Sequence, residues 1–308
     1  MNYFFVFLKG LAMGSADVIP GVSGGTIAFI TGIYDRLLGA ISQVDLQLFK
    51  LIFAGKLKSA AKKIDLNFLL ALFGGILTAV ISLAKLITYL LENHEVALWS
   101  FFFGLIVASS YIIITKIKKW NILNVVLLVI GTLVAYWLTS MRQGAFPDGL
   151  GGIFLSGFIA IIAMILPGIS GSYILVMMGM YEKILGALTA SIGGDFQSII
   201  QILVFILGCI LGLLAFSRLL QWLLLHYHDP VVAVLTGFMI GSLNKVWPWK
   251  NTLETYLDRH GEVKPLIQEN ILPPQLDAEF FIALALAIFA FLFVYILEKK
   301  SKKAIINV

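Results

Sequence analysis

The sequence is poor in charge and nearly lacks cysteine. Of its 308 residues only 13% are charged, about half the share of an average soluble domain. So few charges cannot cover a globule of this size with a solvated surface, which argues against a soluble enzyme, a nucleic-acid-binding protein or a disordered chain. The single cysteine, Cys209, excludes a disulfide framework and a cysteine-based zinc site. The four histidines lack the spacing of metal ligands, so we expect no metal and no cofactor.

Long apolar runs take the place of the missing charge. Hydrophobic residues make up 60% of the chain, and its mean hydropathy is +0.97. A helix that crosses the hydrocarbon core of a membrane needs about 20 apolar residues. Six runs reach or approach this length: 66–91, 98–115, 121–140, 197–225, 231–247 and 279–297. The composition predicts an all-α, multi-pass membrane protein.

Two further apolar segments, 3–34 and 151–181, are interrupted near their middle. The helix-breaking residues are Pro20, Gly21, Pro167 and Gly168. Proline removes a backbone donor and glycine permits a positive φ angle, so a helix should end at each pair. Each arm is then too short to cross a membrane comfortably. Non-helical backbone at membrane depth requires cover from protein or a water-filled cavity, and we expect two re-entrant or broken helical hairpins.

The distribution of lysine and arginine predicts the orientation in the membrane. Alternating the connections assigns most of the 22 basic residues to one side, which the positive-inside rule makes cytoplasmic. They are Arg36, Lys50, Lys56, Lys58, Lys62, Lys63, Lys116, Lys118, Lys119, Arg218, Lys299, Lys300, Lys302 and Lys303. Both termini are expected on this cytoplasmic side. The polar loop 248–278 is expected outside.

The two interrupted segments are copies of one another. Residues 20–40 read PGVSGGTIAFITGIYDRLLGA, and residues 167–187 read PGISGSYILVMMGMYEKILGA. The match needs no gap, and it continues weakly downstream, where Gly75 aligns with Gly208 and Gly104 with Gly237. Such self-similarity is the signature of an internal repeat.

Each repeat contains one hairpin and three spans. The first repeat covers 1–145, with the hairpin 3–34 and a basic cytoplasmic segment at 35–65. The second covers 146–308, with the hairpin 151–181 and the external loop. Whether a hairpin adds no crossing or two, the number of crossings per repeat is odd. The second half then enters the membrane from the opposite face. The chain is therefore expected to form an inverted repeat, an architecture that many secondary transporters use for alternating access.

The repeated turns predict a site for an anion. A helix N-terminus with free N–H groups binds phosphate, and a serine after each Pro-Gly pair is a good N-cap. The candidate phosphate-binding residues are Ser23, Gly24, Gly25 and Thr26 in the first copy, and Ser170, Gly171 and Ser172 in the second. The competing interpretation is that the glycines only allow tight helix packing and the prolines only kink the chain. Two matching turns in inverted halves favour the anion site.

Three charged residues within apolar segments extend this hypothesis. Lys85 and Arg218 occupy equivalent positions in the two repeats, and each is a candidate phosphate contact on its own side. Alternatively, both extend along their helices to the membrane surface. Asp17 precedes the first break and aligns with Met164. It could carry a coupling proton, or it could accept hydrogen bonds from the freed N–H groups of the turn, with Lys9 as its partner.

The triplets Tyr34-Asp35-Arg36 and Tyr181-Glu182-Lys183 follow the hairpins. Tyrosine and basic residues often anchor helix ends at the membrane surface, and we expect that role here. Asn244, Lys245 and Trp247 end a predicted span. They could contact a head group, but anchoring of the helix end is the favoured interpretation.

The paired motifs resemble those of a known family. MGSADVIPGVSGGTIAFITGIYDRLL and its second copy MILPGISGSYILVMMGMYEKIL are similar to the bacterial polyprenyl-phosphate transporter family, and the resemblance spans essentially the whole chain. It implies a flippase in the bacterial cytoplasmic (inner) membrane. Such a protein returns undecaprenyl phosphate to the cytoplasmic leaflet, which recycles the lipid carrier for peptidoglycan and cell envelope biogenesis.

The sequence thus predicts a lipid transporter and not an enzyme, with polyprenyl phosphate and the bilayer as its partners. Protons or another ion could drive it, and no nucleic acid is expected to bind. One alternative is a small inorganic anion transporter or channel. A second is an integral-membrane enzyme that acts on lipid phosphates, although no nucleophile or metal cluster lies near either hairpin. A purely structural scaffold gives no reason for two buried PGxSG turns.

Overall fold

The computed structural model describes residues 2–18, 22–141, 144, 146–257 and 263–306. Pro20 and Gly21 lie outside the described residues, as do three residues at the predicted boundary between the repeats. The helices before this boundary are α1 (Tyr3–Asp17), α2 (Gly24–Ile30), α3 (Tyr34–Ser42), α4 (Leu46–Phe53), α5 (Leu57–Lys63), α6 (Leu66–Asn93), α7 (Glu95–Ile114) and α8 (Ile122–Ser140). Those after it are α9 (Gly149–Ile165), α10 (Gly171–Met177), α11 (Tyr181–Ile192), α12 (Phe196–His226), α13 (His228–Ser242) and α14 (Ala278–Ile306).

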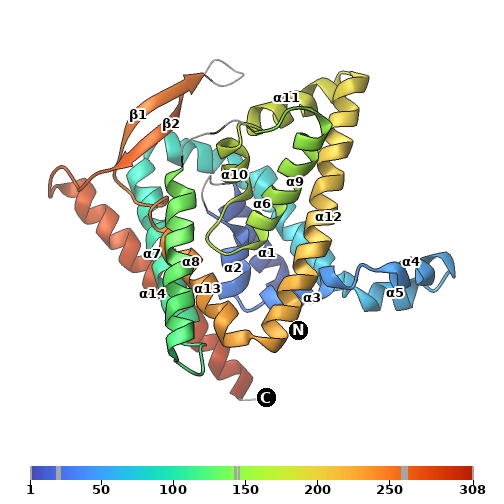
Figure 1. Ribbon diagram of the computed structural model, residues 1–308. Coiled ribbons are helices and arrows are strands. Elements are labelled where there is room, and N and C mark those ends of the chain that lie inside the picture. The colour runs from blue at the N-terminus through green and yellow to red at the C-terminus, as the bar shows by residue number, and fades with distance from the viewer. Residues whose placement is uncertain (1, 19–21, 142–143, 145, 258–262, 307–308) are drawn as a thin grey trace.

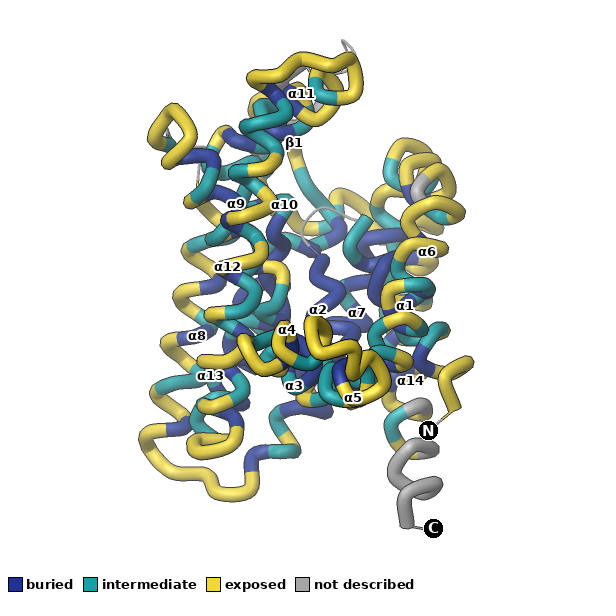
Figure 2. Tube along the Cα trace, turned by 90° about the vertical axis from the view of Figure 1, so that its right-hand side faces the viewer, coloured by how far each residue is buried: buried dark blue, intermediate teal, exposed yellow. Residues whose placement is uncertain are grey.

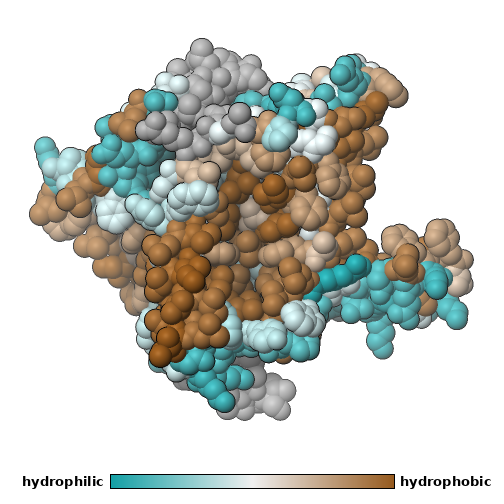
Figure 3. Space-filling view, in the orientation of Figure 1, coloured by the Kyte–Doolittle hydropathy of each residue, from teal (hydrophilic) through white to brown (hydrophobic). Residues whose placement is uncertain are grey.

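The expected multi-pass helical architecture is confirmed. Among the described residues, five helices are long and apolar enough to cross a membrane, namely α6, α7, α8, α12 and α14. The bent pair α10 and α11 would make a sixth. On the face drawn in Figure 3, hydrophobic side chains cover the middle of the molecule, and hydrophilic ones gather toward both its upper and its lower end. This apolar band is what a membrane requires of the protein surface.

The predicted span at 231–247 is shorter than expected. Its helix, α13, ends at Ser242 after 15 residues, and the chain then turns. Pro248 follows closely, and the residue before a proline avoids the helical region. The turn leads into strands β1 (Lys250–Leu257) and β2 (Val263–Asn270), which pair antiparallel. The loop predicted at 248–278 therefore contains a β-hairpin that was not predicted from the sequence.

The helices pack mainly in pairs. In the first half α1 packs against α6, and in the second half α9 packs against α12. The later helices pair across the halves, since α7 packs against α14 and α8 against α13. Aligned glycines allow the backbones to approach, and small residues commonly serve this purpose at membrane helix interfaces. A β-carbon on Gly75 would overlap Phe7 of α1, and one on Gly208 would overlap Phe154 of α9.

The second arm of each hairpin is broken again, which the sequence reading did not predict. α2 and α10 are only seven residues long, and both end before a glycine with positive φ, Gly32 at 68° and Gly179 at 65°. α10 and α11 meet at an angle of 104°. These glycines align in the repeat, and this was the available signal for the second break. The short helices lie near the centre of the molecule, and every residue of α2 is buried (Figure 2).

The two ends of the molecule differ. The start of α1, the end of α14 and the arm formed by α4 and α5 lie toward one end, and the β1–β2 hairpin lies at the other (Figure 1). The basic segment predicted at 35–65 is therefore folded, as α3, α4 and α5. The basic arm and the β-hairpin thus occupy opposite ends, the arrangement that the charge distribution predicts.

Candidate functional site

In the first hairpin turn, the backbone N–H groups donate hydrogen bonds to acceptors within the same hairpin. Ser23 is the N-cap of α2, and its hydroxyl accepts a hydrogen bond from Gly25 N at 3.1 Å. Gly24 N donates to Asp17 Oδ1 at 2.7 Å, and Thr26 N donates to Ser23 O at 3.0 Å. The N-terminal N–H groups of a helix have no partner within the helix. Here three of them are satisfied by the hairpin itself.

Asp17 therefore accepts a hydrogen bond from the turn, so one of its two predicted roles is confirmed. The suggested pairing of Lys9 with Asp17 is wrong. Lys9 Nζ donates instead to Thr31 O, at the C-terminal end of α2, at 2.6 Å. Eight residues of helix span about 12 Å, so α1 places an acid at the N-terminus of α2 and a base at its C-terminus. Both charges complement the helix dipole and hold this short helix in place.

The two hairpins contact each other at their turns. The Ser23 hydroxyl is 3.3 Å from the carbonyl oxygens of Met164 and Leu166, at the end of α9. In return, Gly168 N donates to the Thr26 hydroxyl at 2.9 Å. A β-carbon on Gly25 would lie 2.6 Å from Ile165 O, so only glycine fits there. The first turn thus packs directly on the break of the second hairpin.

Tyr34 joins this contact. Its side chain is buried, and its hydroxyl donates to Ile165 O at 3.0 Å. The interpretation of Tyr34 as an anchor at the membrane surface is therefore wrong, because the bend at Gly32 turns α3 back toward the other hairpin. The Tyr34-Phe29 ring contact, 4.9 Å between centroids, packs α3 on α2.

The second turn keeps two N–H groups free. Ser170 caps α10, and its hydroxyl accepts from Tyr173 N at 3.4 Å and lies 2.9 Å from the Ser172 hydroxyl. Within the described part of the chain, neither Gly171 N nor Ser172 N has a hydrogen-bond partner. Buried N–H groups are nearly always paired with protein or water. Two adjacent free donors beside two hydroxyls form a cradle suited to an oxyanion.

The difference between the turns originates in one pair of aligned residues. Asp17 lies against Gly24, and Met164, the aligned residue, lies against Gly171, with its Cβ 3.2 Å from where a glycine β-carbon would be. The backbone arrangement is thus repeated, but the side chain of methionine has no oxygen to accept from Gly171 N. The turns also differ at the next aligned pair, where the first copy has Gly25 and the second has Ser172.

Lys85 and Arg218 lie away from the turns. Lys85 is exposed on the outer surface of α6. Arg218 is exposed on α12, and its guanidinium donates to Ser42 O at 3.3 Å and to Val44 O. Cations stabilise the C-terminal end of a helix, so Arg218 holds the end of α3 against α12. The structure packs the first turn, held by Asp17, against the end of α9 and Gly168, and it leaves these two cations outside.

The position of Arg218 leads to a prediction about stability. Replacing it by alanine removes two hydrogen bonds from a charged donor to exposed carbonyl groups. We expect the free energy of unfolding to fall by about 1–2 kcal/mol, measured by denaturant titration of the purified protein in detergent. Lys85→Ala is the control, and it should change this free energy by less than about 0.5 kcal/mol. Equal stability of the two variants would contradict an anchoring role.

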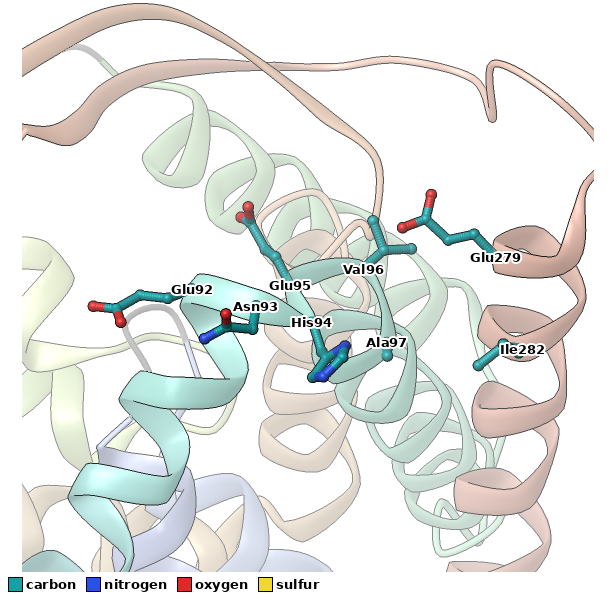
Figure 4. Close-up of a pocket in the computed structure, with 8 residues that line it drawn as sticks. All are labelled: Glu92, Asn93, His94, Glu95, Val96, Ala97, Glu279 and Ile282. Carbon is teal, nitrogen blue, oxygen red and sulfur yellow. The ribbon is translucent and has the colours of Figure 1, made fainter.

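An acidic pocket lies at the end of the molecule that carries the β-hairpin. It has a volume of about 440 Å³ and is lined by Glu92, Asn93, His94, Glu95, Val96, Ala97, Glu279 and Ile282. Figure 4 shows that the glutamate side chains spread apart around it and do not converge on one point. In the described residues no group of His, Cys, Asp and Glu could hold a metal ion. Three carboxylates would repel a phosphate, so this pocket does not suit the predicted ligand.

These features define a multi-pass helical membrane protein with two broken hairpins that meet at PGxSG turns. The chain belongs to the undecaprenyl phosphate translocase-like family, whose model it matches over residues 13–264. It is 45% identical to a polyprenyl-phosphate transporter of Vibrio cholerae, over 98% of both chains. It is 32% identical to a polyprenyl-phosphate transporter of Staphylococcus aureus, over 78% of this chain and 85% of that protein. No solved structure matches the chain.

Proposed function

We propose that the protein is a flippase that returns polyprenyl phosphate from the outer to the cytoplasmic leaflet of the bacterial inner membrane. Its relatives are named polyprenyl-phosphate transporters, and the free N–H groups of the second turn support the choice of an anionic substrate. A phosphate head group needs a polar, donor-rich site, while a long isoprenoid tail can remain in the bilayer. The protein transports the lipid without changing it chemically.

In this proposal the phosphate is held in turn by the two hairpins. The turn from Ser170 to Ser172 receives it first, because its N–H groups are free. The turn from Ser23 to Thr26 accepts it next, when the head group displaces Asp17 from Gly24 N. A proton on Asp17 would weaken its hold on this N–H group and lower its repulsion of the phosphate. Proton coupling through Asp17 is therefore part of the mechanism.

The two halves, 1–145 and 146–308, act as inverted repeats around this site. The matched packing of α1 on α6 and of α9 on α12 supports the repeat, and so do the helix pairs that cross between the halves. Rocking of one half against the other exposes the turns to each leaflet alternately. Both termini face the cytoplasm. Lys85 and Arg218 contact the head group on their own sides, Arg218 after it leaves the end of α3.

A flip assay in reconstituted vesicles tests the hairpin site. The double variant Ser23→Ala/Ser170→Ala removes the hydroxyl that caps each short helix, and each N-cap hydroxyl contributes about 1 kcal/mol. We expect the transport of polyprenyl phosphate to slow about tenfold or more, the rate equivalent of about 1.4 kcal/mol. Ser109→Ala, at a buried serine that bonds only within its own helix, is the matched control. Wild-type rates in the double variant would contradict the site.

The same assay separates the proposed function from its alternatives. Wild-type vesicles that move inorganic phosphate but not polyprenyl phosphate would favour a small-anion transporter. Release of inorganic phosphate from the lipid by the pure protein would favour an enzyme.

A further inference from the structure

The β-hairpin end of the protein contains an ammonium group that lacks a partner. Lys250 begins β1, and its Nζ is buried without a hydrogen-bond partner among the described residues. It lies 3.8 Å from the centroid of the Trp99 ring on α7. The attraction between a cation and an aromatic face is modest, and it does not replace the water or carboxylate that a buried ammonium needs.

The nearest acid does not neutralise Lys250. Glu95 attracts this ammonium at a distance, but its carboxylate accepts a hydrogen bond from Trp99 Nε1 at 3.1 Å, and no salt bridge joins it to Lys250 in the described structure. Lys245 adds a second positive charge close by. Burial and the charge of Lys245 lower the pKa of Lys250 to about 7, and Glu95 raises it only in part.

Lys245 connects this end of the protein to the second hairpin. Its Nζ lies 4.7 Å from the centroid of the Tyr173 ring, and Tyr173 follows Ser172 in α10. Burial also lowers the pKa of Lys245. Asn244, the preceding residue, donates to the Ser140 hydroxyl at 3.0 Å, which fixes the turn after α13 against the end of α8. The two lysines therefore form a cationic region next to the helix that carries the free N–H groups.

We propose that Lys245 and Lys250 form a receiving site for a phosphate monoester at the β-hairpin end, from which the head group passes to the turn of α10. This inference rests on the proposed transport of polyprenyl phosphate. Two neighbouring ammonium groups that make no salt bridge in the described part of the chain favour a ligand of more than one negative charge. A phosphate monoester carries about 1.5 to 2 negative charges near neutral pH. Binding supplies the direct ion pairs that Lys245 and Lys250 lack among the described residues.

The experiment measures affinity and stability together. Purified protein in nanodiscs of zwitterionic lipid is titrated with polyprenyl phosphate and, separately, with inorganic phosphate. We expect Lys245→Gln/Lys250→Gln to raise the Kd for polyprenyl phosphate at least tenfold. We also expect Lys250→Gln alone to unfold at the same temperature as the wild type or higher, because it removes an unpaired buried charge. A lysine that only packs on Trp99 would instead lower the melting temperature and leave the Kd unchanged, which would overturn the proposal.

Lys183→Gln is the matched control. It removes the same charge from α11, a helix toward the same end of the molecule in Figure 1, but Lys183 already pairs with Asp148 at 2.8 Å. Its Kd should stay within twofold of the wild type. If Lys250→Gln does not fold, the single variant Lys245→Gln tests the proposal. A Kd for polyprenyl phosphate within twofold of the wild type overturns the proposal, and a rise of fivefold or more supports it.

The two ligands and the flip assay separate the remaining outcomes. If the double lysine variant loses binding of both ligands, the site recognises the phosphate itself. If it loses binding of the lipid alone, the site recognises the lipid head group. Both results support the proposal. Wild-type protein that neither binds nor flips polyprenyl phosphate would overturn the proposed function. If the double lysine variant transports the lipid and binds polyprenyl phosphate as well as the wild type does, only the lysine site is overturned.

Discussion

Replacing Asp17 by alanine should abolish transport and destabilise the protein by about 2–3 kcal/mol. The substitution removes the acceptor for Gly24 N, and a hydrogen bond to a charged group contributes about 1.5–3 kcal/mol. Gly24 is buried, and Asp17 lies so close to it that no other side chain fits between them. The freed N–H group cannot be reached by bulk water, so its desolvation is not compensated. The change also removes the acid that holds the N-terminus of α2, and with it the alignment of Ser23 against α9.

Asparagine at the same position separates the two roles of Asp17. Its side-chain oxygen still accepts from Gly24 N, so we expect Asp17→Asn to recover most of the stability that alanine loses. It cannot gain or release a proton. If Asp17 carries the coupling proton, transport by Asp17→Asn loses its dependence on a pH gradient across the vesicle membrane. A normal dependence would remove coupling through Asp17 and leave only the structural role. Denaturant titration and the flip assay, run on the same protein preparation, provide both measurements.

The two hairpins are asymmetric at one aligned position. Met164 takes the place of Asp17 in the second repeat, and its lack of an oxygen leaves Gly171 N free. One turn is therefore closed by an internal acid while the other remains open, although their motifs are nearly the same. A transporter that holds one anion needs only one open turn at a time. In the proposed mechanism, Asp17 is an internal substitute for the phosphate, and it keeps the first turn ordered until the head group arrives.

Much of the fold can be predicted from the sequence, because membrane helices have few structural options. Apolar runs of sufficient length predicted α6, α7, α8, α12 and α14, and the Pro-Gly pairs predicted the ends of α1 and α9. The second break in each hairpin was missed. A glycine inside an apolar run is also common in an intact membrane helix, so only its recurrence in the repeat distinguishes Gly32 and Gly179. The β-hairpin was missed because its residues have no clear alternation of polar and apolar side chains.

The site was predicted less completely than the fold. The PGxSG motifs predicted the turns at which the two hairpins contact each other. A motif that recurs in the sequence marks a local backbone conformation, so it can be recognised without knowing the fold. The contact of Tyr34 with α9 and that of Lys245 with Tyr173 join segments more than 70 residues apart. No spacing rule connects such positions in a single sequence. Charge alone did not identify the binding residues either. Lys9 and Arg218 bind carbonyl groups at helix ends, and such carbonyl groups stabilise a cation as a bound anion would.

Gly75→Ala should be among the most destabilising single changes, by about 3 kcal/mol. A β-carbon at Gly75 would overlap the backbone oxygen of Phe7 and lie 2.7 Å from Leu11 N, so α1 and α6 would have to separate. Backbone cannot move aside as a flexible side chain does, and overpacking of this kind costs about 1–3 kcal/mol or more. Because α1 carries both Lys9 and Asp17, its displacement would also release the two ends of α2. We therefore expect transport to be lost together with stability.

The adjacent glycine provides the control. A β-carbon at Gly74 would meet only the Phe7 ring, at 3.9 Å, so Gly74→Ala changes the same helix without an overlap. It should leave the free energy of unfolding unchanged or raise it by up to about 1 kcal/mol, since alanine favours the helix over glycine. Gly208→Ala, the aligned change in the second half, should match Gly75→Ala, because its β-carbon would overlap the backbone oxygen of Phe154. Equal stability of Gly74→Ala and Gly75→Ala would mean that α1 is not packed backbone to backbone on α6. Such a result would also remove the reason for the recurrence of this glycine in the two halves of the chain.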